Sequence, residues 1–439
     1  MNTIFVGLSK YILTIFAAFY TIQCFLSFSF TNEEDRYPFY VLQTLFLSAF
    51  HVSAFACLSI RMGQPNNLMM LCLAEEVFLI GFLLLYKFLY RDSSWLLTSN
   101  TCFFLATSFV MLTRLSLSKS LKQFAIAALC TIITMAIPFI VQRFGLFRAL
   151  TFHYAIFGIA ALSAVFIFGA VTRGSRLSFT LAGVTFQPSE IVKISFILCL
   201  SGLLARDSFA PPPRGRVLIS SLIAAVHVLI LVLSRDLGSA LIFFIVYFII
   251  LYASLRSPLT LFSGAILGGA GAFIGYRLFS HVRNRVIAWR DPFSVIEGQG
   301  YQITQSLFAI GTGSWFGMGL MMGSPDKIPI VEADFIFSAI SEELGCIFSI
   351  LLILVILSTI LMFMNISLRV NSAYYRLVAL GISACYAFQI FLALGGVTKF
   401  IPMTGVTLPL ISYGGSSVFS TMLMLQIMQG IYLIRSQYS

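Results

Sequence analysis

A long polar stretch, residues 283–334, interrupts a chain that is otherwise strongly apolar. It carries glycines and charged side chains, and it ends on Asp334, directly before the apolar run that begins at Phe335. A carboxylate where a polar loop meets a membrane helix is costly to bury, so it usually faces a cavity or a cation. Because a carboxylate can accept a proton from a bound hydroxyl group, Asp334 is the leading candidate for acid–base chemistry.

Three basic side chains are candidates for holding an anionic group near Asp334. Arg283 and Arg285 lie in the polar stretch, and Lys399 lies in a later segment rich in glycine and proline. We expect these two segments to flank one cavity, where cations would stabilise a phosphate-containing group. Pairing with lipid head groups or loop carboxylates explains each residue equally well, so both interpretations stay open.

Polar residues also open two of the apolar runs. In Gln187-Pro188-Ser189-Glu190, the proline and the glutamate suit a first helical turn, and Lys193 can pair with Glu190. A capped helix with a local ion pair and a wall that faces substrate are both open for this motif. Asp236 precedes another apolar run, and a helix cap is its simpler explanation.

Two further carboxylates, Glu342 and Glu343, follow Asp334 within its apolar run. On a continuous helix, Glu342 would lie about 80° around the axis from Asp334 and about 12 Å deeper, whereas Glu343 would point nearly the opposite way. Glu342 is therefore an open candidate for either a structural role or a contact with substrate.

Composition determines the class of protein that must position these residues. The chain has 439 residues, of which 59% are hydrophobic and 10% charged. Repeated apolar runs of about 20 residues then predict an all-α, polytopic membrane bundle, and the alternating pattern of a membrane barrel is missing. The net charge of +11 is typical of basic loops that contact the lipid bilayer, and we expect no nucleic acid partner. The eight cysteines form no CxxC pair, so neither a zinc site nor a disulfide framework is indicated.

About thirteen spans are expected by the length rule. Basic residues at 206–216, at 366–376 and in the tail fall on one side, which the positive-inside rule makes cytoplasmic together with the C-terminus. The loop at about 280–334 and the N-terminus then lie outside. The expected spans are 8–29, 38–60, 67–87, 94–113, 121–142, 150–171, 188–205, 217–233, 237–254, 258–279, 335–363, 376–396 and 404–434.

Glycines and prolines mark two segments of special backbone. Gly264, Gly268, Gly271 and Gly275 have the spacing that lets helices pack closely. The segment 395–417 contains too many helix breakers for one plain helix, and irregular backbone at membrane depth is tolerated where it lines an enclosed cavity.

Five motifs occur in a fixed order along the chain. They are Gly183-Val184-Thr185-Phe186-Gln187-Pro188-Ser189-Glu190, Asp236-Leu237-Gly238, Gly300-Tyr301-Gln302 with Gln305-Ser306, Asp334-Phe335-Ile336-Phe337 with Glu342-Glu343-Leu344-Gly345, and Pro402-Met403-Thr404-Gly405 through Ser416-Ser417. With these motifs the chain resembles the SEDS family, typified by RodA, FtsW and SpoVE. The family core has ten spans, which match the last ten here. Residues 94–439 then form the core with its large outer loop, and residues 1–93 form an additional region of about three spans by length.

The resemblance implies a peptidoglycan glycosyltransferase of the bacterial cytoplasmic membrane that polymerises lipid II into glycan strands. It implies a class B penicillin-binding protein as partner, and it maps the essential extracellular aspartate of the family onto Asp334. Gln302, Gln305 and Ser416 lie in matching motifs, and we expect them to contact substrate. No cofactor is assigned, although basic side chains or a divalent cation, Mg²⁺ or Mn²⁺, could balance the charge of the leaving pyrophosphate.

Two rival functions remain open at the level of sequence. A lipid II flippase would also use polar residues and broken helices within the membrane. A non-catalytic scaffold for a penicillin-binding protein would not need Asp334. Elongation, division and sporulation are not distinguished.

Overall fold

The computed structural model describes residues 2–30, 33–143, 147–172, 175–181, 184–206 and 211–436. This part of the chain is almost entirely helical. Its helices are α1 (Asn2–Leu26), α2 (Glu33–Met62), α3 (Pro65–Leu89), α4 (Trp95–Leu115), α5 (Leu117–Thr134), α6 (Ile137–Arg143), α7 (Thr151–Phe168), α8 (Pro188–Leu204), α9 (Arg214–Leu233), α10 (Leu237–Leu255), α11 (Pro258–Leu278), α12 (Ser280–Arg290), α13 (Tyr301–Gly313), the 3₁₀ helix η2 (Pro325–Lys327), α14 (Ile336–Arg369), α15 (Ala373–Val397) and α16 (Gly415–Ser436).

The all-α, polytopic fold predicted from composition is confirmed. Within the described ranges, twelve helical segments are long and apolar enough to cross a membrane. Helix α8 has 17 residues, which is still sufficient to span the apolar layer of a bilayer. Together these segments correspond to the thirteen expected spans.

The expected start of the last span, residue 404, is wrong, because the last helix begins at Gly415. Residues 398–414 form an irregular segment with left-handed backbone at Lys399, Gly405 and Leu410, which agrees with the helix breakers noted at 395–417. The outer loop at about 280–334 lies between α11 and α14 as expected, and it contains the helices α12 and α13.

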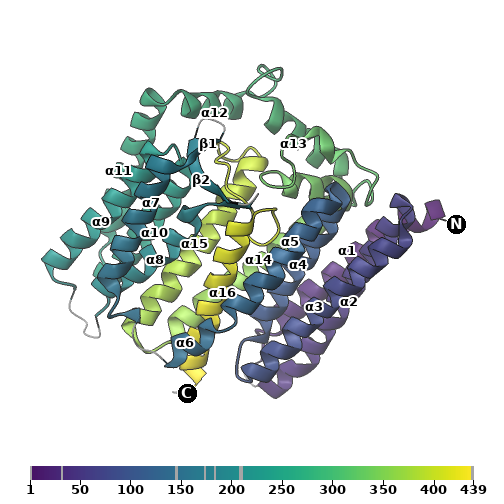
Figure 1. Ribbon diagram of the computed structural model, residues 1–439, viewed down its shortest axis with the longest axis horizontal. Coiled ribbons are helices and arrows are strands. Elements are labelled where there is room, and N and C mark those ends of the chain that lie inside the picture. Colours follow the sequence, from purple (N-terminus) through teal and green to yellow (C-terminus); the bar gives the residue numbers. More distant parts are fainter. Residues whose placement is uncertain are drawn as a thin grey trace.

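The long helices run side by side, with α12 and α13 lying across one end of the bundle and the C-terminus lying at the other (Figure 1). Helix α4 is central, and the apolar window of this helix is completely buried. Helices α1 and α2 pack against α14 and α4 respectively, so the N-terminal helices share one continuous apolar core with the rest of the chain.

A small antiparallel sheet precedes α8. Its strands are β1 (Ala170–Thr172), β2 (Ser175–Leu181) and β3 (Val184–Phe186), in the order β1-β2-β3, and Thr180 is paired with Thr185. Strand β3 leads directly into Gln187, which caps α8, so the sheet sets the position of the polar motif at the start of that helix.

Helix α14 is broken near its first third. Gly345 has φ +89° and ψ 172°, so the helix divides into a short first part, residues 336–344, and a long second part. The segment 314–324, here called the strap, runs along this break. It donates backbone hydrogen bonds from Met318 and Gly319 to the carbonyls of Glu342 and Glu343. It also accepts hydrogen bonds from the amides of Cys346 and Ile347, so the polar groups freed by the break are paired.

Helix α11 lies at the edge of the bundle, where it contacts mainly α10 and α12. The close packing expected of its glycines is found for two of the four. Gly264 lies against Phe248 and Gly268 lies against Phe244, both from α10. Gly271 and Gly275 have no neighbouring atom within 4 Å of the position of a Cβ atom.

Candidate functional site

A cavity of about 230 Å³ opens at the end of the bundle that carries α12 and α13. Asp334 contributes a carboxylate to its lining, Arg285 and Trp289 contribute from α12, and Gln302 contributes from α13. The irregular segment 398–414 closes the cavity with Met403 and Gly405. Four separate parts of the chain therefore meet around the residue that the sequence singled out.

Asp334 and Arg285 converge on Gly405. A Cβ atom placed on Gly405 would lie 3.7 Å from Arg285 Nη2 and 4.0 Å from Asp334 Oδ2. Gly405 also has φ +75°, so both its backbone and its missing side chain keep this space open. The carboxylate and the guanidinium consequently face the same small volume.

Arg285 as a whole residue is exposed to solvent, while surrounding protein atoms partly desolvate its guanidinium group. Burial lowers the pKa of its guanidinium, and the carboxylates of Asp334 and Asp236 oppose that shift. Arginine nevertheless keeps its charge at neutral pH. Its Nη1 donates a hydrogen bond of 2.8 Å to the Thr404 carbonyl, which fixes the side chain against the irregular segment.

Trp289 makes a second link between α12 and the same segment. It lies one helical turn after Arg285, and its Nε1 donates a hydrogen bond of 3.1 Å to the Lys399 carbonyl. Sequence reasoning did not select Trp289. The spacing of four residues from Arg285 was the signal that could have found it, because residues at this spacing share one helix face.

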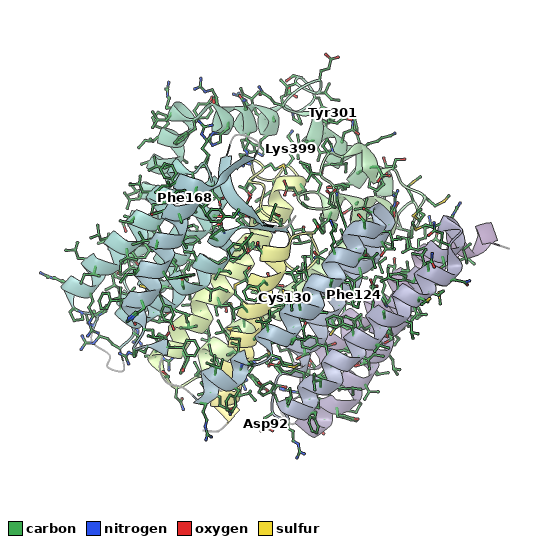
Figure 2. All side chains as sticks on the ribbon, in the orientation of Figure 1. Asp92, Phe124, Cys130, Phe168, Tyr301 and Lys399 are labelled. Carbon is green, nitrogen blue, oxygen red and sulfur yellow. The ribbon has the colours of Figure 1, made fainter. Side chains whose placement is uncertain are left out.

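The other two basic candidates lie outside the cavity lining. Arg283 is exposed, and its Nη2 donates a hydrogen bond to the Arg277 carbonyl at 3.5 Å. Lys399 lies at the same end of the molecule as Tyr301 of α13, opposite Asp92 (Figure 2). Of the three cations, Arg285 is the one that the structure brings to Asp334.

Of the two glutamines expected to contact substrate, only Gln302 lines the cavity. Gln302 lies in the first turn of α13 and lines the cavity, whereas Gln305 is half-buried outside the lining. Ser306 holds α13 in place, because its hydroxyl donates to the Val397 carbonyl at 2.9 Å and is 2.6 Å from the Ser338 hydroxyl.

The polar motif at the start of α8 forms a connected network. Glu190 Oε2 accepts hydrogen bonds of 2.7 Å from both Lys193 Nζ and the Ser420 hydroxyl. Lys193 Nζ also donates to Gln389 Oε1 at 2.7 Å, so three helices are joined inside the bundle. The expected Glu190–Lys193 pair is therefore present.

Asp236 caps α10, as the simpler interpretation had it. Its Oδ1 accepts from the Ser239 amide at 3.1 Å, and its Oδ2 accepts from Gln187 Nε2 and the Ser189 hydroxyl, each at 3.3 Å. Ser416 also contacts this motif, because its hydroxyl oxygen accepts a hydrogen bond of 2.9 Å from the backbone amide of Gln187. Ser416 does not line the cavity. Its expected contact with substrate stays a prediction.

The chain directly before Asp334 is held from two sides. The Ser412 hydroxyl donates to the Ala333 carbonyl at 2.5 Å, and the Tyr413 amide donates to the Glu332 carbonyl at 2.8 Å. The Glu332 carboxylate also forms an ion pair with Lys119 of α5. Asp334 is thus placed by long-range contacts, none of which the sequence revealed.

Glu342 and Glu343 accept hydrogen bonds from the strap and do not line the cavity. Glu342 Oε1 accepts from the Ser324 amide at 2.8 Å, and Glu343 Oε2 accepts from the Met321 amide at 3.2 Å. Glu343 Oε1 also pairs with Arg114 Nε of α4 at 2.7 Å. The continuous helix assumed for Glu342 ends soon after it, so its expected role in substrate binding remains a prediction without support from the cavity.

A divalent cation does not fit the groups around Asp334 well. Its neighbour Arg285 is itself a cation, and no cluster of three or more His, Cys, Asp or Glu side chains in the described part could hold a metal ion.

The fold and the cavity define a polytopic helical membrane protein with a carboxylate–guanidinium site at one end of its bundle. The family model described as "Cell cycle protein", for FtsW, RodA and SpoVE, matches residues 94–437. The chain belongs to this FtsW/RodA/SpoVE family.

Individual relatives agree with this assignment. The chain is 35% identical over 270 residues to peptidoglycan glycosyltransferase RodA of Mycobacterium tuberculosis, which covers 59% of this chain and 58% of that relative. The chain thus matches less than two thirds of the length of that relative.

Solved structures share the fold. One, of a peptidoglycan synthase complex that coordinates polymerization and crosslinking, is 25% identical with a TM-score of 0.63, and the match covers 79% of this chain and 99% of that one. The rod shape determining protein RodA of Thermus thermophilus is 23% identical with a TM-score of 0.60, covering 80% and 99% of the two chains.

Proposed function

We propose that this chain is a peptidoglycan glycosyltransferase that polymerises lipid II at the outer face of the bacterial cytoplasmic membrane, in elongation, division or sporulation. The observation that carries the proposal is the cavity in which Asp334 and Arg285 face one volume. Membership of the family and the name of the M. tuberculosis relative support the class of reaction.

The reaction needs one base and one source of positive charge. The hydroxyl oxygen of one lipid-linked sugar attacks the anomeric carbon of another, and a glycosidic C–O bond forms. The C–O bond to the pyrophosphate breaks, and undecaprenyl pyrophosphate leaves with the bonding electron pair. Asp334 accepts the hydroxyl proton as general base. Arg285 stabilises the negative charge that develops on the leaving group.

The membrane location suits a substrate with a polar head and a long apolar tail. The head would enter the cavity between α12, α13 and the irregular segment, while the tail would lie along the apolar faces of the neighbouring helices. A cavity at the end of the bundle that carries α12 and α13 suits a catalyst that works at one membrane surface.

The test is purified full-length protein in lipid nanodiscs and proteoliposomes with lipid II. We expect glycan polymer from the parent protein. Translocated monomer without polymer would instead identify a flippase. If neither polymer nor translocated monomer is formed, the protein is better described as a non-catalytic scaffold.

We further propose that the protein works with a class B penicillin-binding protein. The similarity to a structure of a peptidoglycan synthase complex supports this partner.

The expected topology has α12, α13 and the N-terminus outside and the C-terminus in the cytoplasm. Because α12 and the C-terminus lie at opposite ends of the bundle (Figure 1), the structure supports their placement on opposite sides of the membrane.

A further inference from the structure

The N-terminal helices α1–α3 lie outside the family core, because the family match begins at residue 94. Two of them, α1 and α2, nevertheless make specific contacts with the strap, residues 314–324, which belongs to that core. Helix α1 packs along α14, and α2 packs along α4, so this unit lies beside the broken helix that follows Asp334.

One of these contacts is a hydrogen bond from the ammonium group of Lys10. Its Nζ donates a hydrogen bond of 3.0 Å to the Gly317 carbonyl, across 307 residues of sequence. Gly317 has φ +77°, and a Cβ atom there would lie 2.2 Å from the Glu343 carbonyl oxygen. Gly317 thus packs closely against the break in α14, and its carbonyl is bound by Lys10.

Three further contacts join the same two parts. The ring of Tyr11 lies 5.1 Å from the ring of Phe316, measured between centroids. From α2, the Cys57 thiol approaches the Leu320 carbonyl at 4.0 Å, and the Arg61 guanidinium contacts the Met322 sulfur. Both α1 and α2 therefore grip the strap along most of its length.

The strap connects this grip to Asp334. Its backbone and that of residues 342–347 are joined by four hydrogen bonds. It also fixes the carboxylates of Glu342 and Glu343. The first part of α14, which follows Asp334 by two residues, is consequently held by whatever holds the strap.

We infer that α1 and α2 form a clamp on the strap and thereby hold Asp334 in its place in the cavity, with Lys10 as a positioning residue. The inference rests on the proposed function for its effect on catalysis. Its structural part, the clamp itself, is independent of which reaction the cavity performs.

Hydrogen–deuterium exchange and kinetics of the full chain in nanodiscs test the clamp with Lys10→Met, which keeps the stem but removes the ammonium. We expect the rate of amide exchange in 314–324 and 336–344 to rise about tenfold. This is the change that follows from losing the stabilisation of one hydrogen bond to a charged group. The kcat for lipid II polymerisation should fall about tenfold, since small displacements of reacting groups are costly. The KM and the thermal midpoint should stay near those of the parent.

Two further variants separate positioning from general damage. Lys10→Arg keeps a donor at this place and should restore most of both signals. Lys87→Met removes an exposed lysine of α3 that donates to the Arg91 carbonyl at the other end of the bundle, and it should change neither. If Lys10→Met fails to insert, Arg61→Met loosens the same strap from α2.

Unchanged exchange in the strap on loss of Lys10 would overturn the clamp. Raised exchange with an unchanged kcat would overturn the positioning of Asp334. If the parent protein itself makes no polymer, the proposed function fails, while the exchange measurement still decides the clamp.

Discussion

At the scale of single residues, the site depends on which cation reaches the carboxylate. Arg283, Arg285 and Lys399 are equivalent candidates in the sequence, yet Arg285 alone among them lines the cavity with Asp334. The hydrogen bond from Arg285 to the Thr404 carbonyl leaves its second terminal nitrogen directed toward the space at Gly405. A base and a cation are thus held together at the entrance to the bundle.

The first prediction concerns Asp334→Asn, which keeps size and polarity but removes the proton acceptor. We expect retained folding and lipid II binding, with polymerisation reduced by roughly 10²–10⁴-fold. Gel analysis of polymer from labelled lipid II measures this loss. Asp334→Glu is no control, because about 1 Å of displacement is itself costly.

The control for this variant is Asp291→Asn, an exposed carboxylate of the same outer region whose Oδ1 accepts from the Ser294 amide. It should polymerise like the parent. Substantial polymer from Asp334→Asn would rule out the general base.

The second prediction compares three charge-removing variants, Arg283→Gln, Arg285→Gln and Lys399→Gln. Each should weaken lipid II binding more than it lowers expression, and Arg285→Gln should have the largest effect. We expect about a tenfold weaker Kd for it, corresponding to ~1.4 kcal/mol. Titration of nanodisc-embedded protein with lipid II measures the affinity. Unchanged affinity in all three variants and in the triple variant would reject the assignment.

At the scale of elements, the site depends on irregular backbone within a helical bundle. At the break at Gly345 and in the segment 398–414, main-chain amides and carbonyls lack the hydrogen-bond partners that a regular helix would provide. The strap pairs the first set, and residues of α5, α12 and the chain before Asp334 contact the second. Such breaks persist in a membrane only when other protein groups satisfy them.

The third prediction tests the break through Gly345→Ala. Its φ is +89°, and a Cβ atom would lie 2.3 Å from the Gly317 amide nitrogen, so the strap must shift. We expect a loss of about 1–3 kcal/mol from backbone strain alone and a lower midpoint of thermal inactivation. Gly271→Ala on α11, where no atom lies within 4 Å, should leave that midpoint unchanged or slightly higher. Equal midpoints for both variants would contradict this account.

At the scale of the whole molecule, the described chain presents long apolar helices to the bilayer and a polar cavity at one end. Under the proposed function this arrangement would build glycan strands, and the described residues contain no separate folded domain for crosslinking them. The edge helix α11 keeps an open face at Gly271 and Gly275, where another helix could approach closely.

The fourth prediction is that cysteines placed along the outer segments and exposed helix faces capture a class B penicillin-binding protein in living cells. Suitable positions include Gly271 and Gly275 of α11 and Leu357 and Leu361 of α14. Seven of the eight native cysteines are buried, which keeps background reaction low. The complex is refuted if a scan at native expression captures no such protein while activity persists without one.

Much of the fold could be read from the sequence, because the apolar runs needed to cross a bilayer are local features. The helix start at Pro188, the Glu190–Lys193 pair and the cap at Asp236 are local as well, and the structure contains all three. For the same reason Asp334 could be singled out, since a carboxylate between a polar loop and an apolar run is visible in one dimension.

Tertiary structure alone decided which of these groups meet. The Arg285–Asp334 arrangement, the strap over Gly345 and the contact of Lys10 with Gly317 join segments far apart in the chain. In each of them a main-chain carbonyl or amide is one of the partners: the Thr404 carbonyl for Arg285, the Gly317 carbonyl for Lys10, and residues 342–347 for the strap. Every residue possesses such groups, so these partners leave no pattern of side chains to recognise. The sequence determined where polar groups occur, and long-range contacts between side chains and backbone groups determined which of them share the cavity.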